Sequence, residues 1–127
     1  TFVGQEKILA QIKEKTREEL SIFDVIKRYS YGDPVIKEVV SREASYLGKA
    51  LAISSNLLNI DLIILGGYLI HYGSSFLAQV EEAFREHVIS YYRDRTSIKF
   101  AKLGRDAVGI GGASLVLKRV WDLELIR

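Results

Sequence analysis

The feature that most constrains the fold is an uninterrupted apolar run closed by two glycines, Asp61-Leu62-Ile63-Ile64-Leu65-Gly66-Gly67. A run this short is typical of a β-strand rather than a helix. Because polar residues do not alternate with the apolar ones, we expect both faces of the strand to be covered. A central strand of a parallel sheet meets this condition, so the sequence predicts an α/β fold.

A long helix is expected before this strand, from Pro34 to about Leu58. Gly32 ends the preceding helix, Asp33 can accept hydrogen bonds from the free amides of the next one, and Pro34 suits its first position. Apolar residues then recur at spacings of three and four. Several small residues, Gly48 among them, occupy the second half of this helix, so we expect a neighbouring element to lie close to it.

The remaining pattern predicts a small parallel sheet among about five helices. The other expected elements are helices from about Gln5 to Thr16, from Ser21 (capped with Asp24), from Ser74 or Ser75 to about Val88 and from Asp106 to about Trp121, and a strand at Ser97–Leu103. A strand, a helix and a strand at this spacing predict a crossover between two adjacent parallel strands. Two strands make a thin sheet, as though further strands preceded them.

Composition excludes several classes of function. The sequence contains no cysteine, which excludes disulfides and thiolate zinc sites, and a net charge of +2 without a basic stripe gives no sign of nucleic-acid binding. Only His71 and His87 could supply imidazole ligands, so a metal site is not expected. The longest apolar run is far shorter than the roughly 20 residues that span a bilayer. The amino terminus does not resemble a signal peptide and has no initiator Met, so we expect a cytoplasmic location and a fragment of a longer protein.

Two segments carry a resemblance to a known family. Leu47-Gly48-Lys49-Ala50-Leu51-Ala52 leads into Asn56-Leu57-Leu58-Asn59-Ile60-Asp61 and the apolar run with Gly66-Gly67. Later come Arg93-Asp94-Arg95 and Ala101-Lys102-Leu103-Gly104-Arg105-Asp106-Ala107-Val108-Gly109-Ile110-Gly111-Gly112-Ala113. In this order and spacing they are similar to the ROK family of sugar repressors and sugar kinases, from about Leu47 to the end of the chain.

The resemblance implies a partial lobe of the actin-like, ribonuclease-H-like superfamily. Residues 1–127 would form the C-terminal part of the second lobe, with 1–58 helical and 59–127 arranged as strand, helix, strand, helix. The family's sugar-contacting residues, its Cys/His zinc motif and its glycine-rich phosphate turn lie upstream of the matched region. No cofactor is therefore expected in this segment, and ATP with magnesium only if the parent protein is a kinase.

Gly66, Gly67 and Gly104 are the candidate nucleotide-contacting residues. The resemblance places Gly66 and Gly67 at an adenosine-contacting turn. Because glycine has no Cβ, the backbone there could approach the ring or a phosphate of a nucleotide closely. The alternative is that Gly66 and Gly67 only let the chain turn out of a buried strand. ROK kinases commonly continue with a third glycine, whereas Tyr68 here would stand in the mouth of the site. Gly104 and the later set Gly109, Gly111, Gly112 and Ala113 could line the same cleft or permit close packing.

The other polar candidates have ordinary structural explanations. We expect a solvated helix face for Glu81, Glu82 and Glu86, a capping role for Asp106, and surface or half-buried positions for His71 and His87. The aromatic residues are either core or subunit interface, namely Tyr68, Tyr72, Tyr91 and Tyr92 with Phe76 and Phe84.

We therefore expect a C-terminal segment of a ROK transcriptional repressor, contributing to the sugar-responsive effector-binding and dimerisation region and catalysing nothing itself. Its partners would be a sugar effector and operator DNA, both through other parts of the parent protein, and a second copy of the protein; no membrane is expected. The alternative is a fragment of an ATP-dependent, glucokinase-like sugar kinase, and a third possibility is a stand-alone interaction module. A helix-turn-helix upstream would favour the repressor, and a DxGxT-like start the kinase.

Overall fold

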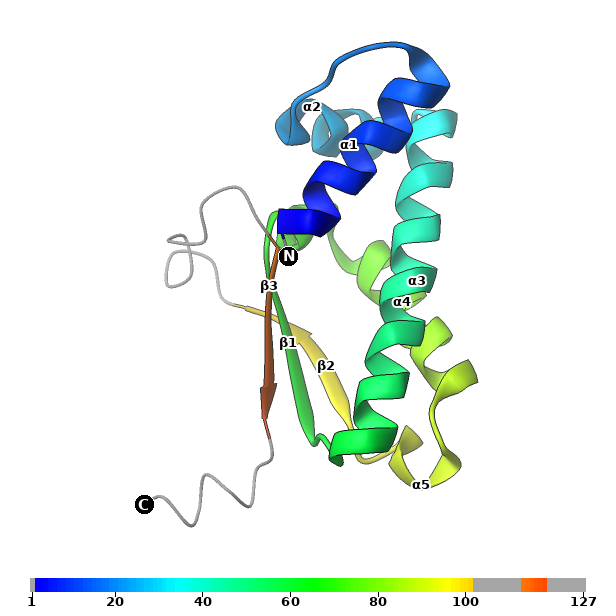
Figure 1. Cartoon of the computed structure of the whole chain (residues 1–127), viewed down its shortest axis with the longest axis vertical. Helices are drawn as coiled ribbons and strands as arrows, with labels where there is room; N and C mark the ends of the chain where they lie inside the picture. Colours follow the sequence, from blue (N-terminus) through cyan, green and yellow to red (C-terminus); the bar gives the residue numbers. More distant parts are fainter. Residues whose placement is uncertain (1, 102–112, 119–127) are drawn as a thin grey trace.

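A computed structural model of the chain describes residues 2–101 and 113–118. Its elements are α1 (Phe2–Thr16), α2 (Ile22–Ser30), α3 (Pro34–Leu58), β1 (Leu62–Gly67), the 3-10 helix η1 (Tyr68–Tyr72), α4 (Ser74–His87), α5 (Ser90–Arg93), β2 (Ser97–Phe100) and β3 (Ala113–Lys118). Figure 1 shows the sheet on one side and the long helices α3 and α4 on the other, with α1 and α2 at one end. The helix-rich α/β class is confirmed.

The three strands lie in the order β2-β1-β3. β1 and β2 run parallel, in register from Leu62 beside Ser97 to Leu65 beside Phe100, so the predicted parallel pair is confirmed. β3 runs antiparallel to β1 on its other edge, from Lys118 beside Leu62 to Ala113 beside Gly67. β1 is therefore the central strand, as its apolar sequence predicts.

The predicted helix from Asp106 to about Trp121 is wrong where the structure describes it, because residues 113–118 form strand β3. The rest of that predicted helix lies outside the described residues. The physical reason is the second edge of β1, whose backbone groups need partners, and the apolar segment Ala113–Lys118 supplies them. The sheet is thus mixed, a parallel pair with one antiparallel strand.

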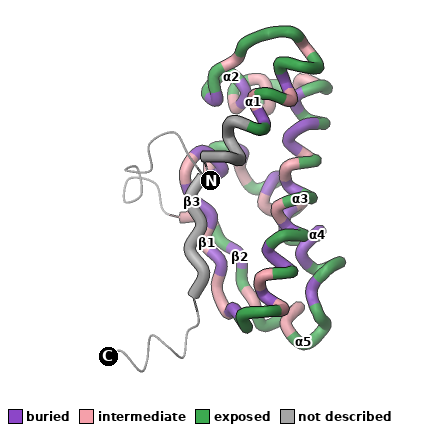
Figure 2. The backbone as a smooth tube through the Cα atoms, viewed as in Figure 1, coloured by how far each residue is buried: buried purple, intermediate pink, exposed green. Residues whose placement is uncertain are grey.

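The two faces of β1 are covered unequally. Ile63 and Leu65 are fully buried in the same core cluster as Val80 and Phe84 of α4, whereas Leu62 and Ile64 are only half-buried. In Figure 2, buried segments recur along α3 and α4. The expectation that both faces are fully covered is therefore wrong for the described residues: the helices close one face.

Close packing of α3 against α4 centres on Gly48. A Cβ built on this glycine would lie 2.4 Å from the carbonyl oxygen of Val80 and 2.9 Å from the amide nitrogen of Phe84. Both atoms belong to the backbone of α4, so the two helices approach at a point where no side chain fits. This confirms the close neighbour predicted from the small residues of α3.

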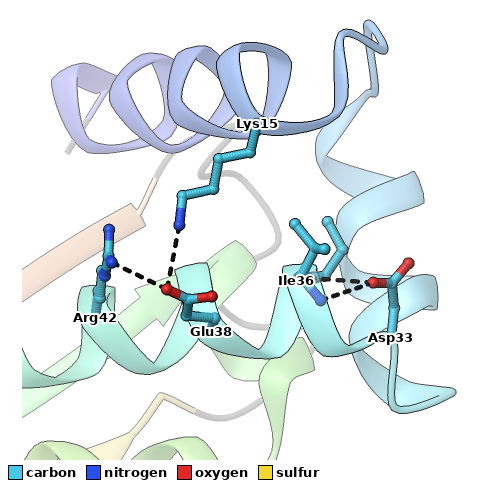
Figure 3. Close-up of polar contacts among 6 residues, drawn as sticks. Lys15, Asp33, Ile36, Glu38 and Arg42 are labelled. Carbon is cyan, nitrogen blue, oxygen red and sulfur yellow. Dashed lines mark hydrogen bonds and ion pairs between the residues drawn. The ribbon is translucent and has the colours of Figure 1, made fainter.

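The helix starts follow the predicted capping chemistry. Asp33 Oδ1 accepts hydrogen bonds from the amides of Val35 at 3.0 Å and Ile36 at 3.3 Å (Figure 3). Ser21 and Asp24 form a reciprocal capping box at the start of α2. These bonds satisfy amides that have no partner inside their helices, which places both helix starts where the sequence predicts them.

An ion-pair network joins α1 to α3. Glu38 Oε1 contacts Lys15 Nζ of α1 at 3.2 Å and Arg42 Nη2 of its own helix at 2.9 Å (Figure 3). The side chains of Glu38 and Arg42 are more than half exposed and that of Lys15 about a third, so this network contributes little energy. The buried residues Ile8 and Ile12 of α1 contribute more to holding α1 in place. None of the helices in the described ranges combines the length and apolar character needed to cross a bilayer.

Candidate functional site

The glycine pair forms a sharp turn at the carboxyl end of β1. Gly67 has φ 69° and ψ −146°, a conformation that side chains strongly disfavour. The chain then enters η1, and a second positive-φ glycine, Gly73 with φ 83°, precedes α4. The structure therefore supplies a purely conformational reason for glycine at position 67, whether or not a ligand approaches it.

Three strand ends meet at this edge of the sheet. The amide of Ala101 donates to the carbonyl of Leu65 at 2.8 Å, and Gly67 pairs with Ala113. Gly104 follows Ala101 by three residues but lies outside the described part of the chain, as do Asp106, Gly109, Gly111 and Gly112. Of the residues described here (65–67, 100–101, 113–114), none carries a charge. The described part of this edge therefore consists of backbone and uncharged side chains.

Tyr68 does not stand in the mouth of the turn, so that expectation is wrong. The residue is 6% exposed, and its hydroxyl donates a hydrogen bond of 2.6 Å to Oε2 of Glu43 on α3. The side chain therefore extends from the turn into the helix layer. The reason is hydrophobic burial: the ring gains more by entering the core than by remaining in water, provided its hydroxyl finds a partner.

Tyr72 organises an aromatic cluster around this contact. Its ring centroid lies 5.3 Å from that of Tyr29, 5.8 Å from that of Tyr68 and 4.8 Å from that of Phe76. Edge-on pairs at these distances each add about 0.5–1.5 kcal/mol beyond area burial. For these residues, and for the buried Phe84, the core explanation holds.

The second half of the predicted aromatic set lies elsewhere. Tyr91 and Tyr92 of α5 pack edge-on with ring centroids 5.0 Å apart, and the guanidinium of Arg95 lies 4.3 Å from the centroid of Tyr91. Tyr91 is 59% exposed. Packing explains Tyr92, whereas an interface role for Tyr91 remains a prediction.

Glu43 is a carboxylate held inside the helix layer. Within the part of the chain that the structure describes, neither its buried Oε1 nor the buried hydroxyl of Tyr72 has a hydrogen-bond partner. Burial raises the pKa of Glu43 to about 7, and the nearby hydroxyls of Tyr68 and Tyr72 only partly oppose this rise. Burial, with the nearby Glu43 carboxylate, raises the pKa of both the Tyr68 and Tyr72 hydroxyls well above their usual range.

The raised pKa of Glu43 links stability to pH. Below about pH 4.5 the carboxyl is protonated in the folded and unfolded states alike, so it has no pH-dependent effect. Between about 4.5 and 7 the unfolded chain releases this proton while the folded protein retains it, so stability falls as pH rises. Above pH 7 the full cost, about 3 kcal/mol, is present.

Sequence reasoning missed Glu43, although a signal existed. Glu43 is three residues after Val40 and four before Leu47, so it lies on the apolar side of α3. A charged residue at such a position needs a polar partner. The partner, Tyr68, is 25 residues away and could not be read from the sequence.

The other polar candidates lie on the surface. Glu81, Glu82 and Glu86 are exposed on α4, which confirms the solvated face. His71 is exposed on η1, and His87 is exposed with Nδ1 at 2.8 Å from the carbonyl of Ala83. These residues do not converge on the glycine turn.

The fold and the glycine turn define a class: part of one lobe of an actin-like α/β domain. A crystal structure of a ROK family transcriptional regulator, a homolog of the E. coli MLC protein, matches with a TM-score of 0.67 and 27% identity, covering 85% of this chain and 29% of that one. The ROK hexokinase from Thermus thermophilus matches with a TM-score of 0.67 at 19% identity, over 82% of this chain and 35% of that one, which shows the shared fold.

Sequence comparison narrows the class to one family. The profile of the ROK family matches residues 3–119. A glucokinase from Halalkalibacterium halodurans is 31% identical over 105 residues, which cover 83% of this chain and 32% of that protein. The chain belongs to the ROK family, and it spans about a third of the length of the relatives it matches.

Proposed function

We propose that this segment belongs to a ROK transcriptional repressor, where it contributes to the sugar-responsive effector-binding and dimerisation region. The observation that supports this most is the likeness to a ROK transcriptional regulator, with a TM-score of 0.67 and 27% identity over 85% of this chain. In addition, the described part of the turn edge carries no charged side chain for a triphosphate.

The contact of Tyr68 with Glu43 suggests how a conformational change at the glycine turn could reach the helices. Glu43 lies in the middle of α3, a helix of 25 residues and thus about 38 Å long. A displacement of the turn on effector binding would act on α3 through Tyr68, and α3 packs against α1. A ligand that favours one of two lobe arrangements would then shift the dimer population and weaken operator binding.

In this proposal the other parts of the parent protein bind the sugar and the operator DNA. The segment itself needs no metal or nucleotide, and the repressor works as a cytoplasmic homodimer. The surface around Ile89 and Tyr91, both more than half exposed, is available for subunit contact.

An ATP-dependent sugar kinase is the second candidate, favoured by the 31% identity to a glucokinase. In a kinase, Gly66 and Gly67 would contact adenosine. Gly104, which follows the last residue of β2 by four positions, would line the same site. The catalytic base would come from outside this segment.

Calorimetry of the full-length protein with ATP and magnesium tests the choice. The repressor proposal predicts no saturable heat at the glycine turn, and the kinase alternative predicts saturable binding that a bulky side chain at position 66 abolishes. Adenosine serves as a second probe, since it lacks phosphates and reports on the turn alone. Binding of adenosine that is lost in Gly66→Val would overturn the proposal.

A further inference from the structure

A basic pocket lies at the opposite end of the parallel strands from the glycine turn. It has a volume of about 250 Å³ and is formed by the second half of α4, by α5 and by the start of β2. In Figure 1, α5 is at the bottom, near the starts of β1 and β2, whereas η1 follows the far end of β1. The function proposed above does not use this pocket.

The charge of the lining is predominantly positive. Arg85, Arg93 and Lys99 line the pocket against a single carboxylate, Glu81. Arg85 also pairs with Asp94 at 3.3 Å, and both side chains are more than half exposed, so this pair is weak. Among the ion pairs of the described residues, none involves Arg93 or Lys99. Within the described residues, Arg93 and Lys99 therefore line the pocket without an ion-pair partner, and the net charge of the lining is positive even with Glu81 counted.

Arg93 carries the most specific signal. Its Nε is buried and has no hydrogen-bond acceptor among the described residues. A buried donor left without a partner costs about 1–3 kcal/mol, more when the group is charged. Nε and a terminal nitrogen of a guanidinium form the fork that binds two oxygens of one anion. An anion in the pocket would supply this acceptor once the Arg93 side chain turns its shielded Nε toward it.

The pocket wall beside Arg93 is fixed by its own hydrogen bonds. The hydroxyl of Thr96 donates to the carbonyl of Ile60 at 2.7 Å, and the amide of Ser97 donates to the carbonyl of Asp61 at 3.0 Å. These bonds tie the start of β2 to the segment before β1. The lining is thus built before any ligand arrives, which lowers the entropic cost of binding.

We propose that this pocket binds a small phosphate monoester or inorganic phosphate. Phosphate carries a charge of about −1.5 to −2 at neutral pH, which matches the two unpaired cations, whereas a single arginine satisfies a carboxylate. The volume of about 250 Å³ lies just below the range of about 300–1,000 Å³ that is usual for ligand pockets, so it suits a small anion.

Calorimetry of the full-length protein with inorganic phosphate tests the proposal, with acetate as the carboxylate probe. Arg93→Gln removes the charge and the buried donor, Arg93→Lys keeps the charge alone, and Lys99→Gln removes an exposed cation on β2. Arg42→Gln makes the same charge change on α3 away from the pocket, where the guanidinium is exposed and pairs only with Glu38. Thermal melting confirms that each variant is folded.

The expected result is phosphate binding with a Kd of about 1 mM or tighter, weakened at least about tenfold by Arg93→Gln and unchanged by Arg42→Gln. Lys99→Gln should weaken binding severalfold, and Arg93→Lys should not restore the wild-type affinity. Absence of saturable phosphate binding, equal affinity for acetate, or wild-type affinity in Arg93→Gln overturns the proposal. These substitutions lie away from the glycine turn, so the titrations with ATP and adenosine that test the repressor proposal do not depend on them, and failure here and failure of that proposal are distinguishable.

Discussion

Replacing Gly48 by alanine should destabilise the protein, although alanine is the better helix former. At an exposed helix position this change would stabilise by about 1 kcal/mol. At position 48 the added Cβ would lie 2.4 Å from the carbonyl oxygen of Val80, 2.7 Å from the Cβ of Ala83 and 2.9 Å from the amide nitrogen of Phe84. Two of these three atoms are backbone, so no side-chain rotation relieves the contact.

The magnitude follows from the displacement that is needed. Ordinary contact begins at 3.4 Å, so α4 must move away from α3 by about 1 Å to admit the methyl group. Overpacking of a core costs about 1–3 kcal/mol, and the upper end applies because backbone must move. After the gain in helix propensity, the net loss should be about 2 kcal/mol.

Urea unfolding followed by circular dichroism measures this loss. Gly48→Val should cost more than Gly48→Ala, because its branches meet the same backbone. Ala50→Leu is the matched control, since Ala50 is exposed on the same helix, and it should change the free energy of unfolding by less than about 0.5 kcal/mol. A Gly48→Ala protein that is more stable than the wild type would refute the packing of α3 on α4 described above.

Three further substitutions test the buried carboxylate and the start of α3 by the same unfolding measurement. Glu43→Gln keeps an acceptor for Tyr68 but removes the charge, so it should stabilise the protein by up to about 3 kcal/mol above pH 7 and have little effect near pH 4; equal effects at both pH values would contradict the buried charge. Tyr68→Phe should cost about 1–3 kcal/mol at pH 8 and less at pH 5, where Glu43 is protonated. A loss that does not change with pH would show that the contribution of Tyr68 is independent of the charge on Glu43. Asp33→Ala should cost about 1 kcal/mol through the lost cap, and no loss would show that the amides of Val35 and Ile36 find other partners.

Local chemistry made much of the fold predictable. Gly32, Asp33 and Pro34 each act on the backbone within a few residues, and α3 begins at Pro34 as they indicate. The apolar run before Gly66 likewise predicts a central strand, and the spacing to Ser97 predicts its parallel neighbour. These signals depend on neighbouring residues and on chain length alone.

Long-range pairing explains what the sequence analysis got wrong. Residues 113–118 follow several glycines and have an apolar content that fits either a helix or a strand, and the open edge of β1 decides for the strand. That edge belongs to a segment some 50 residues earlier, so a local pattern cannot reveal it.

At the candidate site, the backbone turn could be predicted from the sequence, but the side-chain contacts could not. Gly67 could be predicted as the turn, because a positive φ favours glycine. The orientation of Tyr68 could not, because it depends on where α3 places Glu43. The residue that looked like an obstruction of the turn is part of the core.

The central claim is that the segment serves a sugar-responsive repressor. The most direct measurement is operator binding by the full-length protein, followed by fluorescence anisotropy with its own upstream DNA and a panel of monosaccharides. We predict tight binding that one sugar weakens at least about tenfold, equivalent to a coupling free energy of about 1.4 kcal/mol or more. Transfer of phosphate from ATP to a sugar by the same protein, with no DNA binding, would contradict the account.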